Sequence, residues 1–166
     1  MKKAGFFSRL NKEGKLELVE ISEEIKESYL NKANNCLRAS KILLKNEIYE
    51  NSVSEAYYCM YNSLLALFFK TGIKCENHSA SIILLKKLFE KNELFEIISF
   101  AKTERIDKQY HVESEQNLKP NKELGEDMIK KAEDFFIKIR LIIHEMNNEK
   151  INEVREGFKR LIQEDI

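Results

Sequence analysis

The amino-acid sequence predicts an all-α fold, an up-down bundle of four to five helices. The composition is typical of helical proteins, because 34% of the 166 residues are charged, 43% are hydrophobic, and only one proline and five glycines occur. Apolar residues also recur at three- and four-residue steps through long stretches, which is the period of an α-helix. Helices of this length joined by short links pack antiparallel, and the result is a bundle.

The first long helix is expected to begin after Ser22, with Glu23 and Glu24 in its first turn. A hydroxyl at the N-cap accepts a backbone hydrogen bond, and acidic residues in the first turn oppose the helix dipole. The apolar pattern continues to Leu44 and fades at Asn46, where we expect a left-handed cap.

A second helix is predicted over residues 51–71, ending at Gly72. It is apolar on most of its circumference, so we expect it to be central in the bundle or to meet another subunit on one face. Residues 73–79 are typical of a tight polar connection, and a third helical region follows over residues 80–100, with a break near residues 91–92.

Residues 106–121 form the longest stretch without helical periodicity and contain the only proline, Pro120. A fourth helix is predicted over residues 123–146 and a shorter fifth helix over residues 151–166, because apolar residues return there at helical steps.

The chain has the length of one domain, which can bury about 70% of the surface that its unfolded form exposes. We expect residues 1–21 to form a short arm packed on the body, and residues 22–166 to form a single helical domain. The net charge is zero, so the whole molecule is not drawn electrostatically to nucleic acid or to an anionic membrane. Any contact with RNA would have to come from a local basic patch.

Cys36, Cys59 and Cys75 are odd in number and widely spaced, which favours free thiols in a reducing cytoplasm over a disulfide framework. The chain has no run of 18 apolar residues, and its first ten residues lack the apolar core of a signal peptide. We therefore expect a soluble cytoplasmic protein.

Arg105 and His111 are the leading candidates for chemistry. A guanidinium group orients a phosphate in its planar fork, and an imidazole moves a proton near neutral pH. In RNA cleavage without a metal, a histidine takes the proton of the ribose 2′-OH, which then attacks the adjacent phosphorus, and an arginine stabilises the charge that develops.

Neighbouring residues could support this pair. Asp107 would orient Arg105 or fix the histidine tautomer, and Tyr110 would hydrogen-bond a phosphate or stack on a base. Lys102 and Lys108 complete a small basic cluster that could hold one or two phosphates. The simpler interpretation is a solvated helix end, in which the arginine pairs with an adjacent acidic residue, Glu104 or Asp107, at little net energy.

Other candidates have simpler explanations. Cys75 and His78 are half of a zinc site whose second pair is missing, so His78 is expected to cap the next helix or to reach a carbonyl. His144 is expected near a helix C-terminus, where a positive imidazolium interacts favourably with the helix dipole. Tyr57 and Tyr61 share a helical face, where core packing is commoner than base stacking. No Glu-x-x-His occurs at any histidine, which excludes di-iron carboxylate chemistry, and we expect neither metal nor cofactor.

Several segments resemble the HEPN family of small prokaryotic helical proteins, in particular an uncharacterised archaeal-type branch. The resemblance covers roughly residues 22–145, and it rests on residues 28–33, 37–44 and 55–62 together with Gly72-Ile73-Lys74 and the later His78. It implies a four- to five-helix bundle that commonly dimerises, with Arg105 and His111 matching the Arg-x(4–6)-His motif of metal-independent endoribonucleases.

The resemblance also leaves alternatives open. Active members usually have a polar residue after the arginine, where this chain has Ile106, and the branch it resembles most has an Arg…Asp-Tyr pattern that Arg105, Asp107 and Tyr110 would fit. Some relatives are toxins neutralised by a minimal nucleotidyltransferase, and some have lost catalysis. We therefore predict a dimeric ribonuclease-type toxin module, with a non-catalytic nucleotide-binding or partner subunit as the alternative and a plain helical scaffold as a third interpretation.

Overall fold

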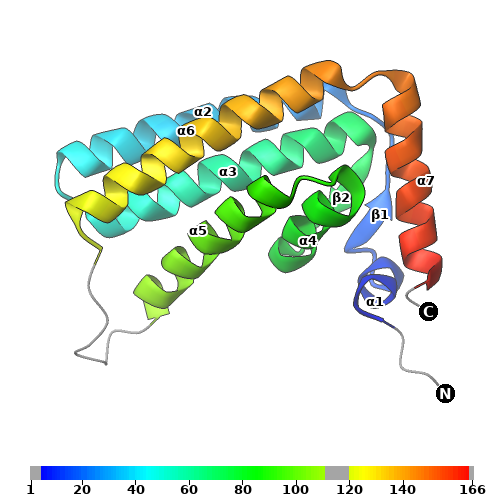
Figure 1. Ribbon diagram of the computed structural model, residues 1–166, viewed down its shortest axis with the longest axis horizontal. Helices are drawn as coiled ribbons and strands as arrows, with labels where there is room; N and C mark the ends of the chain where they lie inside the picture. The colour runs from blue at the N-terminus through cyan, green and yellow to red at the C-terminus, as the bar shows by residue number, and fades with distance from the viewer. Residues whose placement is uncertain (1–4, 111–119, 165–166) are drawn as a thin grey trace.

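The computed structural model describes the backbone of residues 5–110 and 120–164 and the side chains of residues 5–105 and 120–164. This part of the chain folds as seven helices and two three-residue strands (Figure 1), which confirms the predicted all-α bundle. In chain order the elements are α1 (Phe6–Lys12), β1 (Leu16–Leu18), α2 (Glu23–Lys45), α3 (Tyr49–Thr71), β2 (Ile73–Cys75), α4 (His78–Phe89), α5 (Asn92–Tyr110), α6 (Lys122–Glu145) and α7 (Asn148–Glu164).

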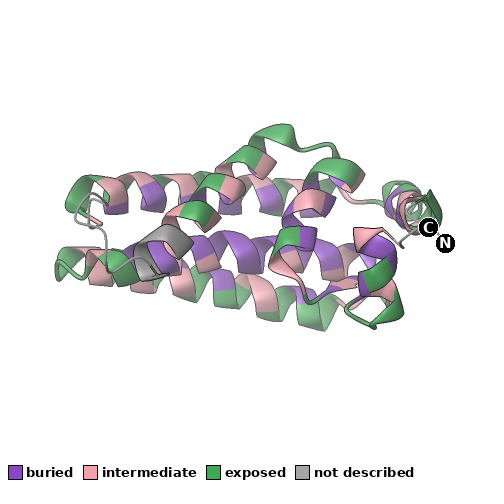
Figure 2. Ribbon diagram, turned by 90° about the horizontal axis from the view of Figure 1, so that it is seen from below, coloured by how far each residue is buried: buried purple, intermediate pink, exposed green. Residues whose placement is uncertain are grey.

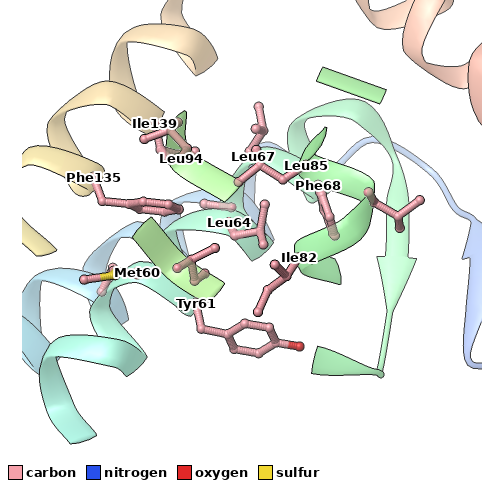
Figure 3. Close-up of a cluster of buried hydrophobic side chains, with 14 of the residues drawn as sticks. Met60, Tyr61, Leu64, Leu67, Phe68, Ile82, Leu85, Leu94, Phe135 and Ile139 are labelled. Carbon is pink, nitrogen blue, oxygen red and sulfur yellow. The ribbon is translucent and has the colours of Figure 1, made fainter. Parts of the chain in front are cut away.

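Helix α3 is the centre of the bundle, as its apolar circumference predicted. It packs against α2 and α6, which run beside it along the long axis, and α5 crosses it (Figure 1). Buried residues lie along the inside of the bundle and exposed ones along its outer edges (Figure 2). Figure 3 shows the core that results, in which α3 meets the other helices through residues that include Met60, Leu64, Leu67, Phe68, Ile82, Leu85, Leu94, Phe135 and Ile139.

Helix α2 begins as the sequence predicted and ends differently. The Ser22 side chain accepts a hydrogen bond from the backbone N–H of Ile25 at 3.1 Å. Asn46 was expected to take the left-handed conformation, but this is wrong, since its φ is −96° and Glu47 takes the positive φ of 62° instead. The Asn46 side chain donates to the carbonyl of Ile42, which satisfies a free carbonyl of the last turn, and the reversal follows one residue later.

The predicted polar connection over residues 73–79 is wrong at its start, because Ile73–Cys75 forms β2. This strand pairs antiparallel with β1 of the N-terminal arm, with Leu16 opposite Cys75. Phe7, Leu10 and Leu16 of the arm are buried in the core. Two segments of three residues are too short to show alternation in a sequence, so only their pairing in the folded chain identifies them as strands.

Gly72 joins α3 to β2 and lies at the meeting point of distant segments. Its φ of 69° is in the left-handed region, as the helix end at a glycine predicted. Arg155 of α7 reaches this junction and donates from Nη1 to the carbonyl oxygens of Val19, Thr71 and Gly72, at 3.0, 3.1 and 3.0 Å. Helix α7 stands across this end of the bundle (Figure 1) and is thus tied to both the arm and the central helix.

The third helical region breaks where the sequence predicted and extends further than expected. Glu90, with φ of 55°, separates α4 from α5. Helix α5 then continues to Tyr110, so Arg105 lies within a helix and not at the edge of an irregular stretch. Most residues of this extension are charged or polar, so the sequence shows no apolar stripe there. Within the described ranges, none of the helices is both long and apolar enough to cross a membrane.

Candidate functional site

Arg105 lies against two aromatic rings of the central helix. The centre of its guanidinium group is 4.8 Å from the ring centroid of Tyr58 and 5.3 Å from that of Tyr57. A guanidinium over an aromatic face is attracted by the negative potential of the ring. Tyr57 is completely buried and its position is fixed by the core, so it holds the half-buried arginine in one place at the surface of α3.

Arg105 has no acidic partner among the described side chains. Its Nε atom is buried and makes no hydrogen bond there, and none of the ion pairs in this part of the chain includes the arginine. The predicted alternative of a pair with Glu104 is therefore not formed. A buried donor without an acceptor is costly, and an anionic ligand would supply the missing acceptor.

His78 occupies the first turn of α4, and its ring faces the same tyrosines. Its Nδ1 is 2.7 Å from the hydroxyl of Tyr57, and the ring stacks on Tyr61 with centroids 3.8 Å apart. The expectation that His78 caps this helix is wrong. Asn77 is the N-cap, and its side chain accepts the hydrogen bond from the N–H of Ala80, so the histidine is free to face α3.

Lys102 brings a second cation to the same place. It lies one turn before Arg105 on α5, and its Nζ donates to the hydroxyl of Ser79, the residue after His78, at 2.6 Å. Three helices thus converge on what we call the basic–aromatic cluster, which consists of Tyr57, Tyr58, His78, Lys102 and Arg105.

The charges of the cluster act on its titratable groups. Burial lowers the pKa of His78 below its ordinary value of 6.5, and the positive charges of Arg105 and Lys102 lower it further. Burial raises the pKa of Tyr57 well above its ordinary range, against the opposing effect of the Arg105 charge. At neutral pH the cluster therefore contains two cations, a neutral imidazole and a protonated phenol.

The lowered pKa of His78 has a consequence for stability that can be measured. The unfolded chain, with an ordinary histidine pKa, takes up a proton at His78 before the folded chain does, so stability must fall as the pH drops through about 6.5. Urea unfolding of the wild type and of His78→Gln should show the wild type losing more stability between pH 7.5 and 5.5. A constant difference between the two proteins over this range would contradict the shift.

The other predicted site residues are placed as follows. Asp107, Lys108 and Tyr110 belong to the last turns of α5, and their side chains lie outside the described residues. His111 lies outside the described residues altogether. His144 is exposed in the last turn of α6.

No metal site is present in the described part of the chain. None of its His, Cys, Asp and Glu residues gather in a group of three or more that could hold an ion. Cys75, half of the sequence's Cys-x-x-His, has its Sγ 3.5 Å from the carbonyl of Asn77, to which it donates. All three cysteines are free thiols, and burial raises the pKa values of Cys36 and Cys59 to about 11 and about 12.

Sequence reasoning placed Lys102 and Arg105 together, and both lie on α5, but it did not connect His78 and the tyrosines with them. Tyr57 precedes His78 by 21 residues, and Arg105 lies further along the chain, on α5. No local spacing therefore connects the three residues. The one usable signal was a pair of tyrosines four residues apart on a helix that is apolar on most of its circumference, since buried phenol groups need hydrogen-bond partners.

Fold and cluster together define a small helical-bundle protein with a cationic site at the crossing of three helices. The family model of the HEPN domain matches residues 26–161. The chain therefore belongs to the HEPN family.

Named relatives agree with this assignment. A Methanocaldococcus jannaschii protein named "Putative toxin" is 30% identical over 76% of this chain and 94% of its own length. A UPF0332 protein of Thermotoga maritima is 29% identical over 75% of this chain and 95% of its own length. A second M. jannaschii protein named "Putative toxin" is 30% identical over 69% of this chain and 78% of its own.

Proposed function

We propose that this chain is a HEPN toxin-type, metal-independent endoribonuclease module in which Arg105 binds the scissile phosphate. The observation that carries the proposal is an arginine whose buried Nε has no acceptor in the described part of the chain, beside a second cation, Lys102. Relatives that are named as toxins support the toxin part of the proposal.

The proposed reaction is transphosphorylation. The ribose 2′ oxygen gives its proton to a general base and forms a bond to the adjacent phosphorus, while the bond from phosphorus to the 5′ oxygen breaks and that oxygen takes up a proton. Arg105 would neutralise the charge that grows on the non-bridging oxygens. His111 remains the proposed proton-transfer residue, with support from Asp107, Tyr110 and Lys108 next to it in sequence.

Assembly belongs to the same proposal. We expect a cytoplasmic homodimer in which this region lies near the interface between protomers, and a minimal nucleotidyltransferase as the neutralising partner. Sedimentation of the purified protein measures the dimer directly, and the proposed reaction requires no cofactor.

The test is cleavage of single-stranded RNA by the purified protein in excess EDTA. We expect cleavage to persist in the chelator and to leave a 2′,3′-cyclic phosphate, because the ribose hydroxyl is the nucleophile. His111→Ala should reduce the rate by at least 100-fold, given the usual contribution of a general base of about 10²–10⁴. Loss of all cleavage in EDTA would contradict the metal-independent mechanism, and an unchanged rate in His111→Ala would contradict that residue's role.

A second candidate is a non-catalytic nucleotide-binding or partner subunit of a minimal nucleotidyltransferase. One observation favours it: the described cluster has the cations and donors of an anion-binding site, while its histidine, His78, is held neutral and hydrogen-bonded. This candidate predicts that the protein binds nucleotides or a partner and cleaves no RNA.

A further inference from the structure

The two ring nitrogens of His78 have different surroundings. Nδ1 is engaged by the Tyr57 hydroxyl at 2.7 Å, and one face of the ring is covered by Tyr61. Nε2 makes no hydrogen bond with any residue that the structure describes. The side chain is half-buried, so this second nitrogen is available to a ligand at the surface of the cluster.

The surroundings of Tyr57 fix which nitrogen carries the proton. The buried phenol keeps its proton because burial raises its pKa, against the opposing effect of the Arg105 charge. Nδ1 of His78 is the one hydrogen-bond partner that this hydroxyl has among the described residues, so the protonated phenol donates its O–H to Nδ1. An imidazole that accepts at Nδ1 must carry its proton at Nε2.

Both cations of the cluster lie close enough to His78 to act on its charge, and each is held by a neighbour of the histidine. Lys102 is held by Ser79, the neighbour of His78 in α4, and Arg105 rests on the ring of the same Tyr57 that bonds the histidine. A neutral donor near two cations is a set of groups that recognises phosphate oxygens, since it adds a directed hydrogen bond to charge neutralisation.

We propose that His78 is a phosphate-binding residue, whose Nε2–H donates to a non-bridging oxygen of the RNA phosphodiester held by Arg105 and Lys102, with Tyr57 fixing the tautomer. The inference rests on the proposed function in so far as it takes RNA as the ligand of Arg105. It assigns His78 a hydrogen bond and no proton transfer, so His78 binds substrate without acting as the general base.

Two substitutions separate this role from a merely structural one. The side-chain amide of glutamine reaches the place of Nε2, and that of asparagine reaches the place of Nδ1, so His78→Gln keeps the ligand donor and His78→Asn keeps the Tyr57 contact. The probe is a single-stranded 2′-O-methyl oligoribonucleotide, which lacks the attacking hydroxyl, and its binding is followed by fluorescence anisotropy.

We expect His78→Gln to bind within about threefold of the wild type and His78→Asn to bind about tenfold more weakly, because a hydrogen bond to a charged group corresponds to about tenfold or more in affinity. Equal weakening by both variants, or no weakening by either, would overturn the inference. Arg105→Ala distinguishes the two proposals: if it binds like the wild type, the phosphate role of Arg105 fails, whereas if it weakens binding and His78→Asn does not, only the role of His78 fails.

A measurement on the wild-type protein removes any dependence on the folding of variants. Two-dimensional ¹H–¹⁵N spectra of the imidazoles, with the His78 signals assigned by their loss in His78→Gln, should show a protonated Nε2 and an unprotonated Nδ1 at pH 7.5. Titration with inorganic phosphate should shift the Nε2 signal more than the Nδ1 signal. The opposite tautomer, or an Nε2 signal that phosphate does not move, would overturn the inference.

Discussion

Gly72→Ala is expected to lower the free energy of unfolding by about 3 kcal/mol, the largest stability effect that we expect of a single added methyl group in this chain. The backbone there is left-handed, which costs a residue with a side chain roughly 1–2 kcal/mol. An added Cβ would also lie 2.6 Å from the carbonyl oxygen of Val19 and would collide with the Arg155 guanidinium. The backbone carbonyl cannot move without disturbing the strand pair, so the arm and α7 would both be displaced.

Gly14→Ala is the matched control. Gly14 has the same φ of 69°, but a Cβ there would meet nothing within 4 Å. This variant should lose only the conformational cost of about 1–2 kcal/mol. Urea unfolding of the two variants measures the difference, which isolates the crowding at the junction. Equal losses would show that the contacts of Val19 and Arg155 contribute nothing there.

Arg105→Ala is expected to reduce RNA cleavage by about 10²–10³-fold, the usual loss when a donor to transition-state charge is removed. The stability cost should be small, since a cation–π contact at a partly exposed site contributes about 0.5–1 kcal/mol. Arg105→Lys should fall between the wild type and the alanine variant, because an ammonium group keeps the charge and loses the planar fork that binds two oxygens. Single-turnover rates in EDTA measure all three proteins.

Arg160→Ala is the control for this series. It also removes one positive charge, but Arg160 is exposed on α7, at the other end of the bundle from the last turns of α5 (Figure 1). Its cleavage rate should equal that of the wild type. A comparable loss in both variants would indicate a general electrostatic effect, and an unchanged rate in Arg105→Ala would contradict the proposed phosphate contact.

The parts of the fold that sequence reasoning predicted are those determined by local pattern. The Ser22 cap, the central helix and its end at Gly72 each depend on a few neighbouring residues, and the structure confirms them. The strand pair was missed because its energy comes from contact between segments nearly 60 residues apart, as the pairing of Leu16 with Cys75 shows. The length of α5 was missed because its last turns are rich in polar residues, which give no apolar period to detect.

The candidate site likewise has a part that local sequence pattern brings together and a part that only the packing of helices brings together. Arg105 and Lys102 lie on one helix, so their spacing alone placed them together. His78 was assigned to a cap because the helix was predicted to begin at residue 80, whereas it begins at His78 and the preceding Asn77, a preferred N-cap residue, caps it. Only the packing of α4 on α3 brings the imidazole to the Tyr57 hydroxyl.

The single guanidinium of Arg155 makes the first and last segments of the fold depend on each other. It joins α7 to a carbonyl 136 residues earlier in the chain, at Val19, and to the end of the central helix through Thr71 and Gly72. If either segment detached, the guanidinium group or its carbonyl acceptors would lose their hydrogen-bond partners. A deletion at one terminus should therefore loosen the opposite terminus, although the two share no neighbouring sequence.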